Sequence, residues 1–260
     1  MPRPRVYKTE AVVLKRSNLG EADSIVTLYT PNLGKIRAVA KGIRRPKSKL
    51  CGHLDLLTCS TLLIAQGQNL DVVTQCQSIE CFPRVKSDLK RIGCALYMAE
   101  LLDQFAAEQV ENYPVYRLLN DDLLWLGEAR NPDIVLRHFE LQLLSHLGYQ
   151  PELYYCLSCR SPLQQQRNLF SSSGGGVLCP DCSKVEPVAH PISVDALKVM
   201  RFLLESDQAS ARRLRMSGDL SQEVGQLTRS YIRYVLEREV RSLEFLDHLE
   251  AKGRGDCASQ

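Results

Sequence analysis

Four cysteines in the middle of the chain have the spacing of a metal site. Cys156 and Cys159 form one Cys-x-x-Cys pair, Cys179 and Cys182 form another, and nineteen residues separate the two pairs. Two residues between thiolates let one turn present both sulfurs to a tetrahedral ion, and this spacing is typical of a zinc ribbon. Three glycines at 174–176 allow a tight hairpin between the pairs. The sequence therefore predicts one Zn²⁺ held by these four residues.

The expected role of that zinc follows from its number of ligands. Four thiolates fill the tetrahedron, so no position remains for the water or substrate that a catalytic zinc must hold. We therefore expect a structural ion. The competing interpretation is a disulfide or a thioredoxin-type redox motif, but that would not require two matched pairs or fit a chain with no strand–helix unit around either pair.

Six further cysteines are scattered singly through the chain. Several of them fall inside apolar, strand-like runs, which indicates buried reduced thiols rather than a disulfide framework. Their positions are 51, 59, 76, 81, 94 and 257.

A second stretch of the chain concentrates positive charge. Residues 34–50 read GKIRAVAKGIRRPKSKL and contain no acid. The seven cations are Lys35, Arg37, Lys41, Arg44, Arg45, Lys47 and Lys49. Residues 1–85 carry thirteen Lys or Arg against six Asp or Glu, which is +7, so the overall +3 leaves −4 for the rest. This asymmetry predicts a polyanion partner for the N-terminal part, although a solvated loop is the alternative for any charge run.

The sequence also indicates whether the polyanion would be bound through its phosphates or through stacked bases. Tyr7 and Tyr29 are the only aromatic residues among the first eighty, whereas single-strand binders that stack bases usually carry more. We therefore expect binding mainly through backbone phosphates, with little dependence on base sequence. Residues 42–48 end like a nucleotide-binding phosphate loop, but Pro46 removes a backbone donor where the loop needs one, so nucleotide hydrolysis is not predicted.

The elements that carry these residues change type along the chain. The first part has short β-branched segments broken by turn residues, which predict five strands at 6–14, 24–30, 34–40, 54–65 and 69–79. Pro, Asn and Gly at 30–34 and 66–69 are typical of hairpin turns. Five strands in so short a stretch indicate an OB fold, and an SH3-like barrel fits the count nearly as well.

After Pro83 the apolar residues repeat at helical spacing. The pattern predicts helices near 86–108, 114–128, 132–147, 193–205 and 219–250. Asn131 is expected to cap the third of these and Gly148 to end it. In the last, Glu237 precedes Arg241 by four residues, the spacing of a helical ion pair.

These observations predict an α+β protein with an inserted metal module. The expected divisions are an N-terminal OB-fold barrel for DNA binding at 1–81, a helical domain at 82–150 and 189–250, a zinc-binding insertion at 151–188 and a flexible tail at 251–260. No run approaches eighteen apolar residues and the N-terminus lacks the apolar segment of a secretory signal, so we expect a cytoplasmic protein. The five histidines are dispersed, and no hydrolase or dinucleotide-binding motif is present, so nothing indicates an enzyme.

Three segments together give the chain a resemblance to a known family. They are GEADSIVTLYTPNLGKIRAVAKGIRRPKSKL at 20–50, LLSHLGYQPELYYCLSC at 143–159 and GGGVLCPDC at 174–182. With a basic barrel, helices and an inserted ribbon in this order, the sequence resembles the RecO family of bacterial DNA repair proteins. The resemblance covers almost the whole chain.

The resemblance implies a non-enzymatic recombination mediator of the bacterial nucleoid. It implies binding to single- and double-stranded DNA, annealing of complementary strands, and action with RecR to help RecA replace single-strand-binding protein on DNA. The DNA-binding surface of the family is carried over onto the seven cations named above, with Arg16 as an addition, and the zinc ligands onto the four cysteines. Two other hypotheses remain: an OB-fold adaptor that acts mainly through protein contacts of its helical domain, and zinc-dependent hydrolysis, which the closed ligand set disfavours.

Overall fold

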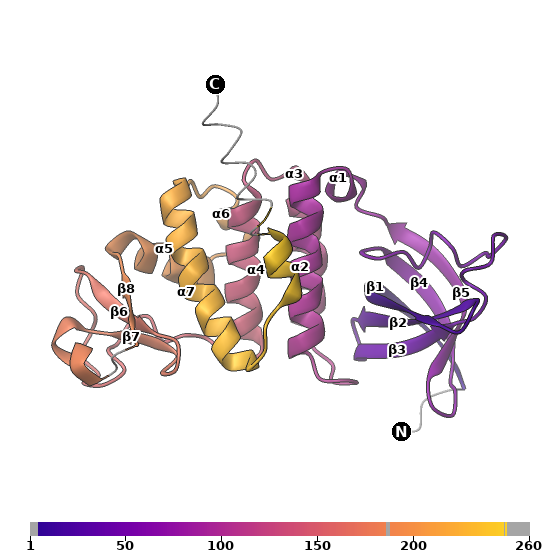
Figure 1. Ribbon diagram of the computed structural model, residues 1–260, viewed down its shortest axis with the longest axis horizontal. Helices are drawn as coiled ribbons and strands as arrows, with labels where there is room; N and C mark the ends of the chain where they lie inside the picture. Colours follow the sequence, from indigo (N-terminus) through magenta and orange to yellow (C-terminus); the bar gives the residue numbers. More distant parts are fainter. Residues whose placement is uncertain (1–4, 186–187, 247, 249–260) are drawn as a thin grey trace. The chain divides into compact units, whose positions relative to one another are not determined.

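The computed structural model describes residues 5–185, 188–246 and 248 (Figure 1). The chain divides into two compact units, the first made of residues 1–128 and 241–260 and the second of residues 129–240. Among the described residues, the first unit contains a five-strand barrel, three α-helices and a helical segment at 241–246, and the second contains four α-helices and a small sheet around the cysteines. The chain is therefore mixed α+β, as the sequence predicts. The predicted tail at 251–260 lies outside the described residues.

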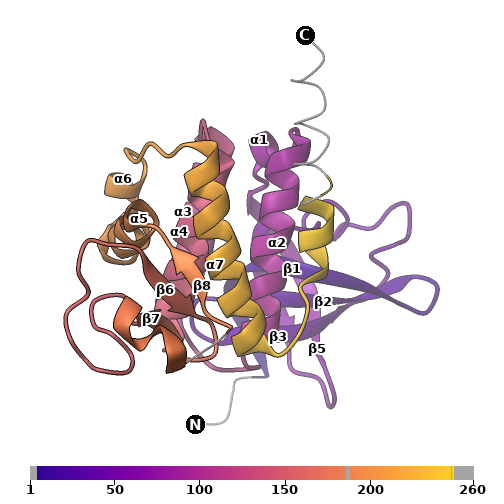
Figure 2. The same cartoon turned by 60° about the vertical axis from the view of Figure 1, so that its left-hand side comes forward.

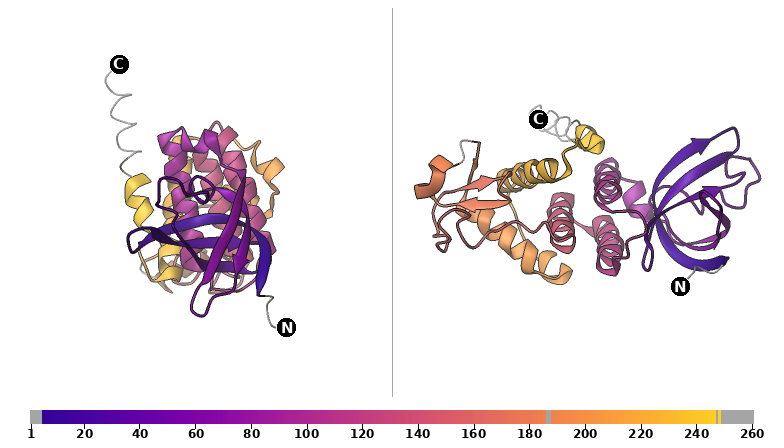
Figure 3. Two further views of the ribbon diagram at one scale, coloured as in Figure 1. Left: turned by 90° about the vertical axis from the view of Figure 1, so that its right-hand side faces the viewer. Right: turned by 90° about the horizontal axis from the view of Figure 1, so that it is seen from below.

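Five strands of the first unit close into an OB-like barrel (Figure 3). They are β1 (Val6–Leu19), β2 (Asp23–Thr30), β3 (Gly34–Ala40), β4 (Cys59–Ala65) and β5 (Asp71–Glu80), in the order β1-β2-β3-β5-β4. β1 pairs with both β2 and β4 because it is long enough to use one half for each. The two predicted hairpin turns are confirmed, since Thr30 faces Gly34 and Ala65 faces Val72 across the ladders.

The barrel interior is filled by alternate residues of each strand. In β3, Ile36, Ala38 and Ala40 point into the core while Lys35 and Arg37 point outward, the alternation expected of a half-buried strand. The predicted strand at 54–65 is too long, because β4 begins only at Cys59. Leu57 has a φ of +55°, which interrupts extended backbone.

Three helices complete the described core of the first unit. They are α1 (Pro83–Lys86), α2 (Leu89–Phe105) and α3 (Tyr113–Glu128). The single helix predicted at 86–108 is wrong in its start, because Asp88 caps a new helix by accepting a hydrogen bond from the Arg91 N–H (2.8 Å). Residues 241–246 form a further helical segment, whose first N–H groups donate to the Glu100 carboxylate.

The second unit packs helices beside a three-stranded sheet (Figure 2). Its helices are α4 (Pro132–His146), α5 (Val194–Glu205), α6 (Gln208–Ala211) and α7 (Gly218–Leu236). Its strands are β6 (Asn168–Ser171), β7 (Gly176–Leu178) and β8 (His190–Ile192), with the 3₁₀ helix η1 (Pro180–Val185) after β7. The Asn131 cap of α4 is confirmed, because its side chain accepts from the Asp133 N–H (3.0 Å).

The predicted last helix at 219–250 is too long. α7 ends at Leu236, and Glu237 takes a left-handed φ of +52°, which reverses the chain. The predicted helical spacing between Glu237 and Arg241 is therefore absent, and Arg233 of α7 pairs instead with Glu239 (3.1 Å). Among the described residues, no helix is both long and apolar enough to cross a membrane.

Candidate metal centre and nucleic-acid interface

The four predicted ligand cysteines converge on one point in the second unit. Their sulfur atoms all lie within 4.8 Å of one another, and the Sγ atoms of Cys159 and Cys179 are 3.8 Å apart. A tetrahedral zinc with Zn–S bonds of about 2.3 Å sets its sulfurs about 3.8 Å apart, so this spacing fits that ion. The described cysteines are free thiols, which also fits a metal rather than disulfides.

A tight turn presents the first cysteine pair. The Arg160 N–H donates to the Cys156 carbonyl (3.0 Å) and the Cys156 N–H to the Ser161 carbonyl (2.9 Å), which folds the intervening residues around the sulfurs. Arg160 closes the turn with a φ of +60°, a conformation that glycine adopts without strain and arginine does not. The second pair lies at the junction of β7 and η1, where the Cys182 N–H donates to the Cys179 carbonyl (3.1 Å).

The local hydrogen bonds prepare two of the sulfurs to be thiolates, the form that binds metal. Burial of Cys156 opposes ionisation, but backbone N–H groups led by that of Cys179 (3.3 Å to Sγ) lower its pKa to about 6. Hydrogen bonds from Ser161 lower the pKa of Cys159. Burial and hydrogen bonds with the neighbouring cysteines raise the pKa of Cys179 to about 12, and a bound cation would favour its thiolate form.

Backbone pairing holds the cysteine module, residues 152–185, together, and a side chain of α5 attaches it to the rest of its unit. Val177 of β7 donates to the Glu152 carbonyl (3.0 Å) and accepts from the Leu157 N–H (3.0 Å). Gly176 has no room for a side chain, since a Cβ there would lie 2.5 Å from the Glu152 oxygen. From α5, Arg201 donates to the Leu153 carbonyl (2.8 Å) and lies over the Tyr154 ring. The module therefore has its own internal backbone pairing, which holds the segments that carry the four cysteines.

The basic loop, residues 41–50, extends from the barrel between β3 and β4. Ile43 anchors it in the barrel core, and hydrogen bonds from Arg45 N to Gly42 O and from Ser48 N to Arg45 O (both 3.0 Å) shape it into successive turns. Five predicted DNA contacts lie exposed on it: Lys41, Arg44, Arg45, Lys47 and Lys49. Within the described part of the chain, none of these five forms an ion pair, although Arg44 donates to the Gly20 carbonyl (3.1 Å).

The other three predicted contacts are held differently. Lys35 is largely covered and donates to the Asp103 carbonyl (2.5 Å) and carboxylate (3.3 Å) at the end of α2. Arg37 pairs with Glu108 (2.7 Å). Arg16, half-buried on β1, donates to the Ser24 hydroxyl (3.4 Å). No acid lies within residues 34–50, but the fold brings Asp103 and Glu108 from elsewhere in the chain to Lys35 and Arg37.

The segment that supplies Glu108 lies along the edge of β3. Glu108 forms a parallel bridge with Lys35, and the Gln109 N–H donates to the Lys35 carbonyl (2.8 Å). A Cβ at Gly34 would lie 1.8 Å from the Val110 oxygen, so only glycine permits this approach. From the sequence, Gly34 is expected only to form a hairpin turn. No pattern in the sequence indicates that β3 contacts residues about seventy positions later.

Comparison with known proteins covers both units. Residues 4–82 match the family model described as Recombination protein O N terminal, and residues 86–244 match the one described as Recombination protein O C terminal. The chain is 44% identical over 245 residues to the DNA repair protein RecO of Roseiflexus sp. (strain RS-1), covering 94% of this chain and 86% of the relative. It is 37% identical over 249 residues to the protein of that name from Dehalococcoides mccartyi (strain CBDB1), covering 96% and 98% of the two chains.

Proposed function

The chain belongs to the RecO family of DNA repair proteins, and from this premise we propose that it is a DNA-binding recombination mediator that anneals complementary strands. The observation that carries the proposal is the basic loop, where five exposed cations have no acid paired with them within the described residues. Phosphates of a nucleic-acid backbone are the natural counter-charges for such a surface. Both single- and double-stranded DNA fit this surface, because backbone contacts do not depend on base pairing.

Annealing follows from the chemistry of that loop. Cations that neutralise two backbones reduce the repulsion between strands, and bases that are not stacked on the barrel stay available for pairing. The barrel supports this, because Tyr29 is 1% exposed and Tyr7 is partly buried against the barrel core, with its hydroxyl donating to Asp71 (2.6 Å). No bond is made or broken in this activity, so the chain acts without catalysis.

The four cysteines would hold one structural Zn²⁺. The ion would supply cohesion to the cysteine module, where few core residues are available, and the closed ligand set leaves it no substrate position. The functional divisions that accompany this role are a DNA-binding barrel at 1–81, a helical domain at 82–150 and 189–250, and a zinc insertion at 151–188.

Partners follow from the family relationship. We include RecR, the single-strand-binding protein and, functionally, RecA in the proposal, with the chain acting on coated single strands at the bacterial nucleoid. The alternative is an adaptor that works mainly through protein contacts of its helical domain. It differs in its DNA affinity, which would be negligible for the isolated chain even at low salt.

Annealing of complementary strands coated with single-strand-binding protein tests the proposal. The wild-type chain should accelerate annealing, and the double reversal Arg44→Glu with Arg45→Glu should lose that acceleration together with DNA binding. Reversal of two exposed cations in the second unit, Lys198→Glu with Arg215→Glu, changes the net charge equally and is the matched control. Annealing that survives the loss of DNA binding would contradict the mechanism.

A further inference from the structure

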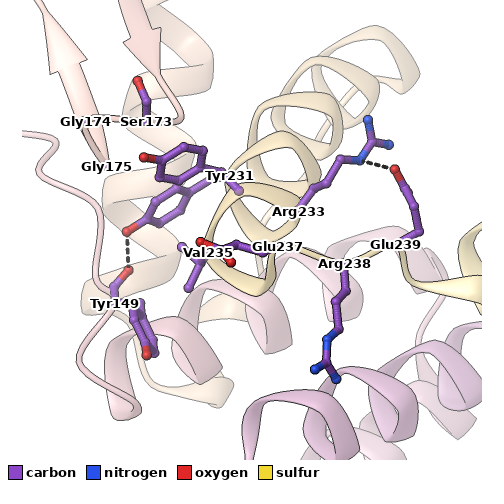
Figure 4. Close-up of a pocket in the computed structure, with 11 residues that line it drawn as sticks. Tyr149, Ser173, Gly174, Gly175, Tyr231, Arg233, Val235, Glu237, Arg238 and Glu239 are labelled. Carbon is purple, nitrogen blue, oxygen red and sulfur yellow. Dashed lines mark hydrogen bonds and ion pairs between the residues drawn. The ribbon is translucent and has the colours of Figure 1, made fainter.

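A pocket of about 670 Å³ lies in the second unit between the end of α7 and the turn that joins β6 to β7 (Figure 4). Its volume is in the range of sites that hold small molecules or single groups of larger ones. Tyr149, Tyr231 and Tyr234 all line it. Figure 4 shows Tyr149 and Tyr231 on one side and the pair of Arg233 and Glu239 on the other.

The turn between β6 and β7 lies beside Tyr231 and lines the pocket with the small residues Ser173, Gly174 and Gly175 (Figure 4). Gly175 has a φ of +68°, and a Cβ there would lie 3.0 Å from the Tyr231 hydroxyl. That hydroxyl donates to the Tyr149 carbonyl (3.0 Å), and the Tyr231 ring packs edge-on against Phe170, so Tyr231 is a fixed wall. Tyr234 and Tyr149 are 54% and 46% exposed, which leaves aromatic surface available to a ligand.

The charges around the pocket cancel. Arg233 pairs with Glu239, and Arg238 and Glu237 contribute one charge of each sign. A balanced lining of this kind suits neither a phosphate nor a metal ion as the main ligand. Glu237 ends α7 in the left-handed capping conformation (φ +52°) and is one of the residues that line the pocket. A flat, uncharged ligand with hydrogen-bond donors fits aromatic faces and a carboxylate together.

We propose that this pocket binds one unpaired base of single-stranded DNA, with the base stacked on Tyr234 and its amino group donating to the Glu237 carboxylate. The inference rests on the proposed function, and it supplies what the barrel lacks, because aromatic stacking surfaces are absent from the described part of the first eighty residues. A carboxylate accepts from the amino group of cytosine, whereas thymine offers no such group. The pocket should therefore prefer cytosine to thymine.

Binding of oligo-dC and oligo-dT of equal length, about twelve nucleotides, tests the stacking step, because both strands carry the same phosphates. Tyr234→Ala should weaken binding of oligo-dC by about 5- to 30-fold, while Tyr234→Phe, which keeps the ring, should stay within about 2-fold of wild type. Tyr155→Ala removes another half-exposed tyrosine of the same unit, outside the pocket lining, and should have little effect. Equal losses in the Tyr234 and Tyr155 alanine variants would overturn the base site.

The ratio of oligo-dC to oligo-dT affinity tests the second contact. Glu237→Gln should reduce this ratio about 3- to 10-fold, and the wild-type ratio should not change with salt, because phosphate contacts contribute equally to both strands. Wild-type binding without any preference for dC would overturn the assigned role of Glu237.

The same binding measurements distinguish failure of the proposed DNA-binding function from failure of the base pocket alone. If the wild-type chain binds neither strand at 50 mM salt, both proposals fall. If it binds both strands and only the Arg44 and Arg45 reversals weaken binding, the basic loop stands and the pocket does not bind a base; occupancy by a peptide would give this result.

Discussion

The cysteine module and the basic loop differ in what their polar atoms contact. In the module, backbone donors surround Cys156 and the four sulfurs face one another. In the basic loop, Ile43 and Leu50 pack against the barrel core, while five charged groups face solvent. A group whose partners are internal stabilises the fold, and a group without internal partners is available to a ligand. From this difference we expect the cysteines to stabilise the fold and the loop to contact DNA.

Removal of a metal ligand should have the largest effect. Cys179→Ser should abolish stoichiometric zinc, measured by metal analysis, and unfold the cysteine module, because structural zinc sites contribute roughly 10–16 kcal/mol of apparent binding free energy. Salt-dependent DNA binding by the barrel should survive. Cys94→Ser, at a buried cysteine outside the cluster, is the control for loss of a buried thiol and should keep its zinc. A folded Cys179→Ser chain that had lost DNA binding would reverse the assignment of the two regions.

Reversal of charge in the basic loop should have the next largest effect. Five phosphate contacts on a single strand predict a slope of log affinity against log salt of about −3.5, which is a loss of about 100-fold between 50 and 200 mM salt. Arg44→Glu with Arg45→Glu should bring the slope to about −2 and weaken binding at 50 mM by at least about 10-fold. Fluorescence anisotropy with a labelled strand measures both quantities. An unchanged slope would mean that the loop does not contact phosphates.

Neutralisation of Glu108 should have a smaller effect of opposite sign. Glu108 forms an ion pair with Arg37 on β3. Glu108→Gln should therefore free the Arg37 side chain for phosphate and strengthen DNA binding by about 2- to 5-fold, the size expected of an exposed ion pair. Glu111→Gln removes the same charge from an exposed residue of the same connection, where the described chain gives it no ion pair. If both variants strengthen binding equally, the effect is one of general charge, and Arg37 is not a latent contact.

The features that depend on residues close together in the chain could be predicted from the sequence. The cysteine spacing, the Asn131 cap and the alternation along β3 each depend on neighbours in the chain, and each is present in the structure. The partners of Lys35 and Arg37 could not be predicted, because Asp103 and Glu108 come from a segment that reaches β3 only after folding. The pocket was missed for the same reason: the glycines at 174–176 were explained by a hairpin, and nothing local connects them with Tyr231.

Arg160 allows the smallest and most specific test of the comparison. Arg160 has a left-handed φ of +60° in the turn that presents the first cysteine pair, which costs a non-glycine residue about 1 kcal/mol. Arg160→Gly should therefore stabilise the zinc-loaded chain and raise Tm by about 2–4 °C. Gly148→Ala is the converse control, because Gly148 has a φ of +83° with nothing within 4 Å of a new Cβ, and it should lower Tm through backbone strain alone.

Arg160 is also a cation beside the four cysteines, so the same variant tests whether the cysteine module contacts DNA. If the cysteine module serves stability alone, Arg160→Gly leaves DNA affinity unchanged while Tm rises. A loss of affinity in that more stable protein would show that the module contacts DNA as well.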